Sequence, residues 1–302
     1  MAKIELKDVT FSYGNESSHA LSHVNLTIEN GEFVCLAGPS GCGKTTLLKL
    51  MAGLLTPASG DIAVNGVPVA GPCTEAAVVF QEYTLFPWMS GRKNVAFGIR
   101  QTHKHLSKQA INEKTTAILR RVGMEAQADK LPGAMSGGMR QRVAIARALA
   151  MDTDILLMDE PFGALDAGIR AELQDLLEEL WNADGRQRKT VIFVTHDMEE
   201  AVRLADRVIY MEPGRIADDI RITVERPRAH VTGESRAKLR NIRCDLIDRM
   251  SGRKVESSAD TATGCGCGTT AHDIEDTVGC GCQSETHDDR NSAGCCCGGG
   301  RE

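Results

Sequence analysis

The strongest chemical signal in the chain is the glycine-rich stretch GPSGCGKTT at residues 38–46. It follows an apolar run of strand length and precedes a helical pattern, which is the context of a phosphate-binding loop (P-loop) rather than of a plain glycine turn. Its glycines allow backbone N–H groups to surround a phosphate at the start of a helix. We predict that Lys44 bridges the β- and γ-phosphates of a nucleotide and that the Thr45 hydroxyl binds Mg²⁺. The predicted nucleotide-binding residues of this loop are Gly38, Pro39, Ser40, Gly41, Cys42, Gly43, Lys44, Thr45 and Thr46.

Two carboxylates follow a second apolar run, ILLMDEP at residues 155–161. A buried strand at this position would deliver both side chains to the phosphate side of a sheet. We predict that Asp159 holds Mg²⁺ and that Glu160 polarises an attacking water as general base. Taken alone, such a string is common and is typical of a strand end with solvated acids. Downstream of a phosphate-binding loop it favours catalysis.

A second glycine-containing loop, MSGGMRQR, occupies residues 135–142. Adjacent glycines after a serine allow backbone amides to approach an anion. This loop comes roughly a hundred residues after the first one and has no lysine motif of its own. Its presence therefore raises the question of which phosphate it serves.

Short apolar runs alternate with helical patterns up to about residue 230, which predicts an α/β fold with a sheet covered on both faces. Strict alternation of apolar residues near the start and an Asn-Gly turn signal in VNGVPV at 64–69 predict an antiparallel β subdomain. The mostly helical stretch from about 90 to 150 predicts an inserted helical subdomain. The predicted fold class is a P-loop NTPase core with these two additions. The runs read as buried strands are 33–38, 76–81, 154–161, 190–196 and 207–212.

Four motifs follow one another in a fixed order: MSGGMRQR, LLMDEP, GALD and VTHD. With this series the chain resembles the nucleotide-binding subunit of an ATP-binding cassette (ABC) transporter, and the resemblance covers residues 1 to about 230. It implies that the chain binds ATP and Mg²⁺ and hydrolyses ATP. It also implies that Gln81 senses Mg²⁺ and the γ-phosphate, that His196 is the switch histidine and that Tyr13 stacks on adenine. Standing alone, Tyr13 would indicate a sheet-edge tyrosine and His196 a core histidine.

The resemblance explains the second glycine loop. In this family two copies pair head to tail, so that Ser136, Gly137 and Gly138 of one copy close on the ATP held by the other. Asp166, in GALD, is then expected to lie between the two subunits. The family's LSGGQ reads MSGGM here, so Met139 replaces a glutamine that contacts the ribose. The part that faces the phosphates is intact.

Charge and hydropathy limit the partners. The net charge of −6 argues against nucleic acid as a partner. No apolar run approaches the ~18 residues that a membrane helix needs. One cassette without a span implies integral membrane permease subunits on separate chains, which is the layout of bacterial importers. We therefore expect a peripheral place on the cytoplasmic face of the inner cell membrane, with a solute-binding protein acting indirectly.

The segment around FQEYTLFPWMS suggests both a partner surface and a cargo. The large or rigid residues 85–89 suit a groove for a permease helix, although they would also suit ordinary core. The sequence of this segment resembles that of the ATPases of nitrate, sulfonate, taurine and bicarbonate importers. This indicates relatedness only, because the cassette never touches the cargo. An ABC ATPase of the Fe–S cluster assembly type, which does not transport, is the alternative, and neighbouring genes would separate the two.

The character of the chain changes after Pro227. Residues 231–256 read as a basic amphipathic helix or linker, and 257–302 as a Cys/Gly-rich low-complexity tail that we predict to be disordered. Closely spaced thiolates suit a soft ion such as Cu(I) or Zn²⁺, and metal bound there would regulate the ATPase. The alternative is a tail whose thiols have no function. The candidate ligands are seven of the 11 cysteines: Cys265, Cys267, Cys280, Cys282, Cys295, Cys296 and Cys297.

Overall fold

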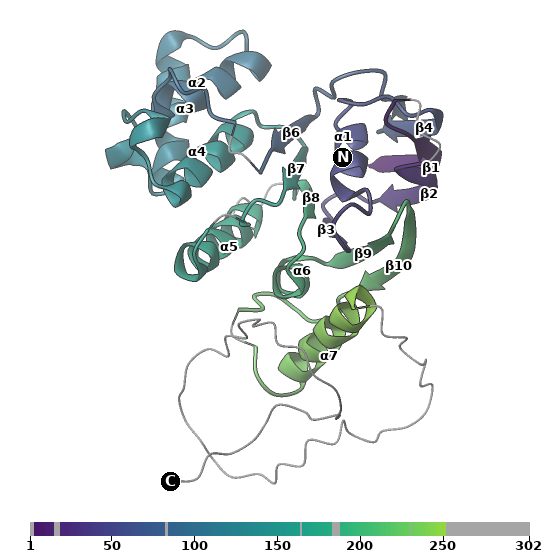
Figure 1. Cartoon of the computed structure of the whole chain (residues 1–302). Coiled ribbons are helices and arrows are strands. Elements are labelled where there is room, and N and C mark those ends of the chain that lie inside the picture. Colours follow the sequence, from purple (N-terminus) through teal and green to yellow (C-terminus); the bar gives the residue numbers. More distant parts are fainter. Residues whose placement is uncertain are drawn as a thin grey trace, which may run out of the picture. The chain divides into compact units, whose positions relative to one another are not determined.

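The computed structural model describes residues 3–14, 19–81, 84–163, 165–182, 188–229 and 231–251. Within this part, two β-sheets enclose a helix, and further helices cover the outer face of the larger sheet (Figure 1). The α/β P-loop NTPase architecture, with its antiparallel sheet and helical insertion, is confirmed. The predicted disordered tail at 257–302 lies outside the described residues.

The larger sheet has six strands in the order β10-β9-β3-β8-β7-β6. All neighbouring strands are parallel except β10, which pairs antiparallel with β9. The central strands are buried on both faces, as their continuous apolar sequences predict. The edge strand β10 was not predicted, because alternating half-buried and exposed polar residues hide its strand character. The strands are β3 (Phe33–Ala37), β6 (Ala76–Val79), β7 (Ile155–Asp159), β8 (Thr190–Val194), β9 (Arg207–Glu212) and β10 (Arg215–Arg221).

The smaller sheet is antiparallel, in the order β2-β1-β4-β5. In β2, Val24, Leu26 and Ile28 are buried and alternate with exposed residues, as predicted. The Asn-Gly turn joins β4 to β5, with positive φ values of 54° at Asn65 and 78° at Gly66. The strands are β1 (Ile4–Phe11), β2 (Leu21–Ile28), β4 (Ser59–Val64) and β5 (Val67–Pro68).

Helix α1 (Lys44–Met51) lies between the two sheets. Its leucines share one buried cluster with inward residues of β1, β2 and β4 and with residues of β3, β7, β8 and β9. The phosphate-binding loop joins the end of β3 to the start of α1. The packing of α1 therefore fixes this loop at the carboxyl edge of the larger sheet.

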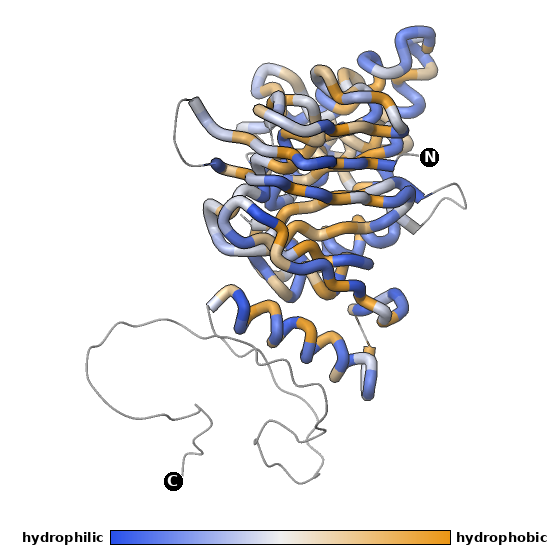
Figure 2. The backbone as a smooth tube through the Cα atoms, turned by 90° about the vertical axis from the view of Figure 1, so that its right-hand side faces the viewer, coloured by the Kyte–Doolittle hydropathy of each residue, from blue (hydrophilic) through white to orange (hydrophobic). Residues whose placement is uncertain are grey.

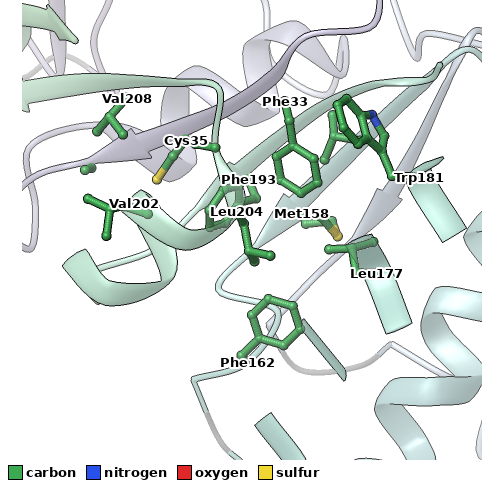
Figure 3. Packing of buried hydrophobic residues seen from close by; sticks show 14 of the residues in the cluster. Phe33, Cys35, Met158, Phe162, Leu177, Trp181, Phe193, Val202, Leu204 and Val208 are labelled. Carbon is green, nitrogen blue, oxygen red and sulfur yellow. The ribbon is translucent and has the colours of Figure 1, made fainter. Parts of the chain in front are cut away.

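The other face of the larger sheet is covered by α5 (Ala167–Asn182) and α6 (Met198–Leu204). Figure 3 shows this packing, in which Leu177 and Trp181 of α5 face the sheet residues Phe33 and Met158. The leucines of α5 divide between two cores, since Leu173 and Leu177 join this cluster whereas Leu180 packs against the core of the helical group. One helix therefore connects the nucleotide-binding core to the helical insertion.

The helical group consists of α2 (Gly91–Thr102), α3 (Lys108–Arg121) and α4 (Gly137–Ala150), with short 3₁₀ turns at Glu125–Gln127 and Pro132–Ala134. It has a core of its own, which includes Val95, Leu119 and Val143. Each of the three helices is capped at its N-terminus by a serine hydroxyl that accepts a backbone N–H.

The last described helix, α7 (Gly233–Met250), packs against α6. Leu239 and Leu246 are buried, and Ile242 and Met250 are half-buried on the same face, as their spacing predicts. Figure 2 shows hydrophobic and hydrophilic residues alternating along α7. The domain boundaries at 230/231 and 256/257 stay a prediction.

Candidate active site

The phosphate-binding loop leaves the end of β3 through two glycines that no other residue could replace. Gly38 has a φ of 145°, and a Cβ there would lie 2.2 Å from the Met211 carbonyl oxygen. Gly43 has a φ of 107°, and a Cβ there would lie 2.8 Å from the Ala20 carbonyl oxygen. The glycines therefore let the loop pass close to neighbouring backbone. Gly43 also takes up the left-handed conformation that directly precedes α1.

Helix α1 starts without a side-chain cap, and the first side chain of the helix is a buried cation. The Lys44 side chain is only 7% exposed, and its Nζ donates to the carbonyl oxygens of Gly38 and Pro39, both at 2.8 Å. In the described part of the chain no carboxylate lies within ion-pair distance of this ammonium. A buried cation held only by neutral groups beside uncapped helical N–H groups fits the phosphates of a nucleotide.

The hydroxyl of Thr45 and the carboxylate of Asp159 meet at the carboxyl edge of the sheet. Thr45 Oγ1 donates to Asp159 Oδ1 at 2.9 Å. Burial raises the pKa of the Asp159 carboxyl above its ordinary value, the Thr45 hydrogen bond opposes this, and the neighbouring Glu160 adds to it. Two hard oxygen donors from the protein, completed by phosphate oxygens, match the way Mg²⁺ is bound in nucleotide sites.

Three side chains that are far apart in the sequence gather next to this pair. Gln81 Nε2 donates to Glu160 Oε2 at 3.1 Å, and His196 Nδ1 lies 3.4 Å from Glu160 Oε1. Glu160 has a φ of 44°, a left-handed conformation that costs about 1–3 kcal/mol for a non-glycine residue. Its backbone N–H donates to the Val194 carbonyl oxygen, so the strained residue is fixed to the sheet. The cluster holds one carboxylate between an amide and an imidazole.

Tyr13 lies beside Thr46, the last residue of the phosphate-binding stretch 38–46. Its hydroxyl lies 3.0 Å from Thr46 Oγ1, and its ring packs edge-on against Phe11. The side chain is 46% exposed, so one part of the ring remains available to a ligand. This position fits the predicted adenine contact.

Arg170 of α5 ties the histidine loop to the start of α5, a link that the sequence did not predict. Its guanidinium donates to Asp197 Oδ2 and to the Leu165 carbonyl oxygen, both at 3.2 Å. Asp197 in turn caps α6, directly after His196. The sequence signal that could have found Arg170 is its place four residues after Asp166, one helical turn into α5.

A buried carboxylate also supports the histidine loop. Glu200, 4% exposed, accepts a hydrogen bond from Thr195 Oγ1 at 2.6 Å. Burial raises the pKa of the Glu200 carboxyl, and the Thr195 hydrogen bond opposes this shift. Thr195 and Asp197, on either side of His196, are therefore both held by α6.

The second glycine loop has a separate place in the chain. Ser136 is exposed and caps α4, where its Oγ accepts from the Met139 N–H at 3.3 Å. A Cβ at Gly138 would lie 2.6 Å from Ile169 Cγ2, so this glycine permits close packing of α4 on α5. Among the described residues, no hydrogen bond joins this loop to residues 38–46. Figure 1 shows α4 in the helical group and α1 beyond β6 and β7.

The comparisons with known proteins agree in kind. The family described as ABC transporter matches residues 21–163. An uncharacterized ABC transporter ATP-binding protein of Methanocaldococcus jannaschii is 44% identical over 252 residues, which cover 81% of this chain and 92% of that protein. The chain belongs to the ABC transporter family. It is an ATP-binding cassette ATPase.

Two further relatives of this cassette carry names that state a cargo. The nitrate import ATP-binding protein of Synechococcus elongatus is 41% identical over 232 residues, 76% of this chain and 84% of that protein. The aliphatic sulfonates import ATP-binding protein of Bacillus licheniformis is 42% identical over 231 residues, 76% of this chain and 88% of that protein. Both relatives are named as ATP-binding proteins of import systems.

A solved structure supports the cassette fold. A dimeric ATP-binding cassette in a post-hydrolysis state, bound to ADP and Pi, matches with a TM-score of 0.65 and 34% identity. The match covers 72% of this chain and 98% of that one. In this cassette, the described helices include none that is both long and apolar enough to cross a membrane.

The cassette brings most of the predicted site residues together and keeps others apart. Residues 38–46, Asp159, Glu160, Gln81 and His196 meet at one edge of the sheet, with Tyr13 beside them. The Asp166 carboxylate accepts the Ile169 N–H at the start of α5 and makes no described contact with that group. The tail cysteines lie outside the described residues. Within the described part of the chain, no cluster of three or more His, Cys, Asp or Glu side chains is suited to a metal.

Proposed function

We propose that this cassette is the ATP-hydrolysing subunit of an importer for a small anion of the nitrate, sulfonate, taurine or bicarbonate type. The observation that carries the catalytic part is the position of Glu160 between Gln81 and His196, next to the Thr45–Asp159 pair. The cargo is inferred from the names of the relatives. A transported solute reaches the permease through a solute-binding protein, and the cassette acts from the cytoplasmic face of the inner membrane.

Each group of the site has one task in this proposal. Lys44 and the loop N–H groups would bind and orient the β- and γ-phosphates. Thr45 and Asp159 would hold Mg²⁺, which would neutralise phosphate charge. Glu160 takes the proton of the attacking water, and Gln81 and His196 fix the carboxylate and the water in line with the γ-phosphate. Burial raises the pKa of the Asp159 carboxyl, and a cation beside it would oppose this shift by attracting the ionised form.

We further propose that the site is completed by a second copy of the chain. Ser136, Gly137 and Gly138 of that copy would present the N-terminus of α4 to the γ-phosphate, whereas in their own chain they make no described contact with residues 38–46. Asp166 would lie at the same interface. Two copies then enclose two ATP molecules, so hydrolysis releases the pair.

The permease would contact the segment that links β6 to α2. Trp88 is 70% exposed, whereas Phe86 is half-buried against Trp88 and Phe97. The buried Asn94 fixes this segment by accepting the Phe86 N–H at 2.9 Å and donating to the Met89 carbonyl oxygen at 3.0 Å. A rigid segment that presents an aromatic side chain is suited to a helix from a partner.

The importer assignment is tested by uptake in cells. A strain that lacks this chain should lose uptake of one labelled anion among nitrate, an alkyl sulfonate, taurine and bicarbonate. The wild-type chain should restore uptake and the Glu160→Gln chain should not. If no uptake changes while Fe–S enzymes lose activity in the same strain, the assembly function replaces the importer function.

We propose that the seven tail cysteines bind Cu(I) or Zn²⁺ and that binding adjusts ATP turnover. The support is the sequence alone: C-x-C and CCC spacings set in glycine. Metal uptake would release protons and weaken as pH falls, since thiolates are the ligands.

The test titrates Cu(I) or Zn²⁺ anaerobically, with reductant, into the full chain and into a chain with all seven changed to serine. We expect high-affinity uptake and a change in ATPase rate by the full chain only. Equal uptake by both chains contradicts the metal site, and uptake without a change in rate contradicts the regulation.

A further inference from the structure

A groove of about 900 Å³ lies between α6, the segment that leads into α7, and α7 itself. Apolar side chains such as Val202, Val231 and Leu239 line part of its wall. The charged residues of the groove are mostly basic, and Glu199 is the one acid among them. The basic residues of the groove are Arg203, Arg228, Arg236, Arg240 and Arg243.

Two of these arginines are used by the fold. Arg228 donates to backbone carbonyl oxygens that include those of Val224 and Ala205, so it holds the preceding segment against α6. Arg203 donates to Gln174 Oε1 and Asp175 Oδ1 of α5. Their terminal nitrogens are therefore committed to structural contacts.

The remaining arginines offer donors that the described chain does not satisfy. Arg236 and Arg240 are exposed, and neither side chain has a hydrogen bond or ion pair with another described residue. Arg243 forms an ion pair with Glu199 at 2.7 Å, yet its Nε is shielded from solvent and has no acceptor. The Nε of Arg203 is in the same situation. The exposed guanidinium groups of Arg236 and Arg240 are therefore available to an anion in the groove.

The spacing of the three arginines on α7 adds to this. Positions 236, 240 and 243 fall on one face of the helix. Glu199 pairs with Arg243, whereas Arg236 and Arg240 bring like charges together with no ion pair to another described residue. The groove thus combines concentrated positive charge, free donors and an apolar wall.

We propose that this groove binds an organic phosphate of about nucleotide size. Guanidinium groups recognise phosphate through paired, charge-assisted hydrogen bonds, and a phosphate dianion can accept from several of them at once. A groove of about 900 Å³ is in the range of sites for small organic ligands, whereas an inorganic phosphate would leave most of it to water. The apolar residues would contact the non-phosphate part of the ligand.

Binding in the groove would reach the catalytic edge through one contact. Arg243 pairs with Glu199, which lies in the first turn of α6, and α6 begins directly after His196 and its neighbour Asp197. A phosphate that draws Arg243 away from Glu199 changes the restraint on the helix that supports the histidine. This coupling, unlike the binding itself, rests on the proposed catalytic role of His196.

The binding test uses AMP as the probe and the full chain with Lys44→Ala, which removes nucleotide binding at the phosphate-binding loop. Calorimetric titration should give AMP binding that Arg236→Ser together with Arg240→Ser weakens at least tenfold. The control pair Arg100→Ser and Arg221→Ser, which removes the same charge from exposed sites elsewhere, should leave it unchanged. Binding should also weaken between 50 and 200 mM salt.

Two further probes separate the sources of the phosphate. Inorganic phosphate should bind more weakly than AMP if the apolar wall contributes. Vesicles of phosphatidic acid, compared with phosphatidylcholine, report whether a lipid headgroup is preferred. Equal affinity for AMP in the groove variant and in its control overturns the site, provided that both unfold at the wild-type temperature.

The coupling has its own readout in chains that keep Lys44. If AMP only competes with ATP at the phosphate-binding loop, it should lower the ATPase rate equally in the wild type and in the groove variant. A change in ATPase rate with AMP that appears in the wild type and in the control pair but is lost in the groove variant supports the coupling. Identical AMP responses in all three overturn it.

Discussion

Changing Glu160 to glutamine is expected to stop ATP hydrolysis while ATP binding persists. Glutamine keeps the size of the side chain but cannot accept the proton of the attacking water, so turnover should fall by about 10²- to 10⁴-fold. The contacts of Glu160 with Gln81 and His196 position the side chain and do not hold ATP. With hydrolysis blocked, ATP should hold two chains together, and size-exclusion chromatography with ATP and Mg²⁺ should show a stable dimer.

Two matched variants make this result specific. Lys44→Ala should lose ATP binding itself, because it removes the buried cation of the phosphate-binding loop. Glu179→Gln changes an exposed carboxylate on α5 that has no part in the site, and it should keep most of the turnover. A Glu160→Gln chain that hydrolyses ATP at nearly the wild-type rate would contradict the assignment of the base.

The local features of the fold could be predicted because their causes are local. The glycine spacing of residues 38–46 determines the phosphate-binding loop. The apolar runs determine the strands β3, β7 and β8. Their order along a parallel sheet then places Asp159 near Thr45, since the carboxyl ends of such strands meet at one edge. The edge strand β10 escaped prediction because none of its residues is buried and most of them are polar.

What the sequence could not show depends on contacts between distant residues. Arg170 and Asp197 are 27 residues apart and meet because α5 and α6 cover the same face of the sheet. Glu200 reads as an ordinary surface acid of α6 until the fold turns it toward Thr195. The groove beside α7 depends in the same way on how two helices pack. Gln81 and His196 were predicted from family resemblance, not from spacing.

The central claim is that the active site is shared between two copies, and a mixture of two inactive chains tests it. Lys44→Ala destroys the phosphate-binding loop of one chain, and Ser136→Arg blocks the glycine loop of the other. Ser136 is exposed, so arginine fits without disturbing packing, although loss of the cap costs about 0.5–2 kcal/mol and unfolding temperatures must be compared. Each mixed dimer then retains one intact pair, made from Lys44 of one chain and Ser136 of the other.

The decisive measurement is phosphate release by this mixture, with mixed dimers verified by native mass spectrometry. A shared site predicts ATP turnover above that of either variant alone, and the turnover should grow with the fraction of mixed dimers. If the glycine loop served its own chain, every chain in the mixture would be defective. Verified mixed dimers that release no more phosphate than the separate variants would contradict the shared site.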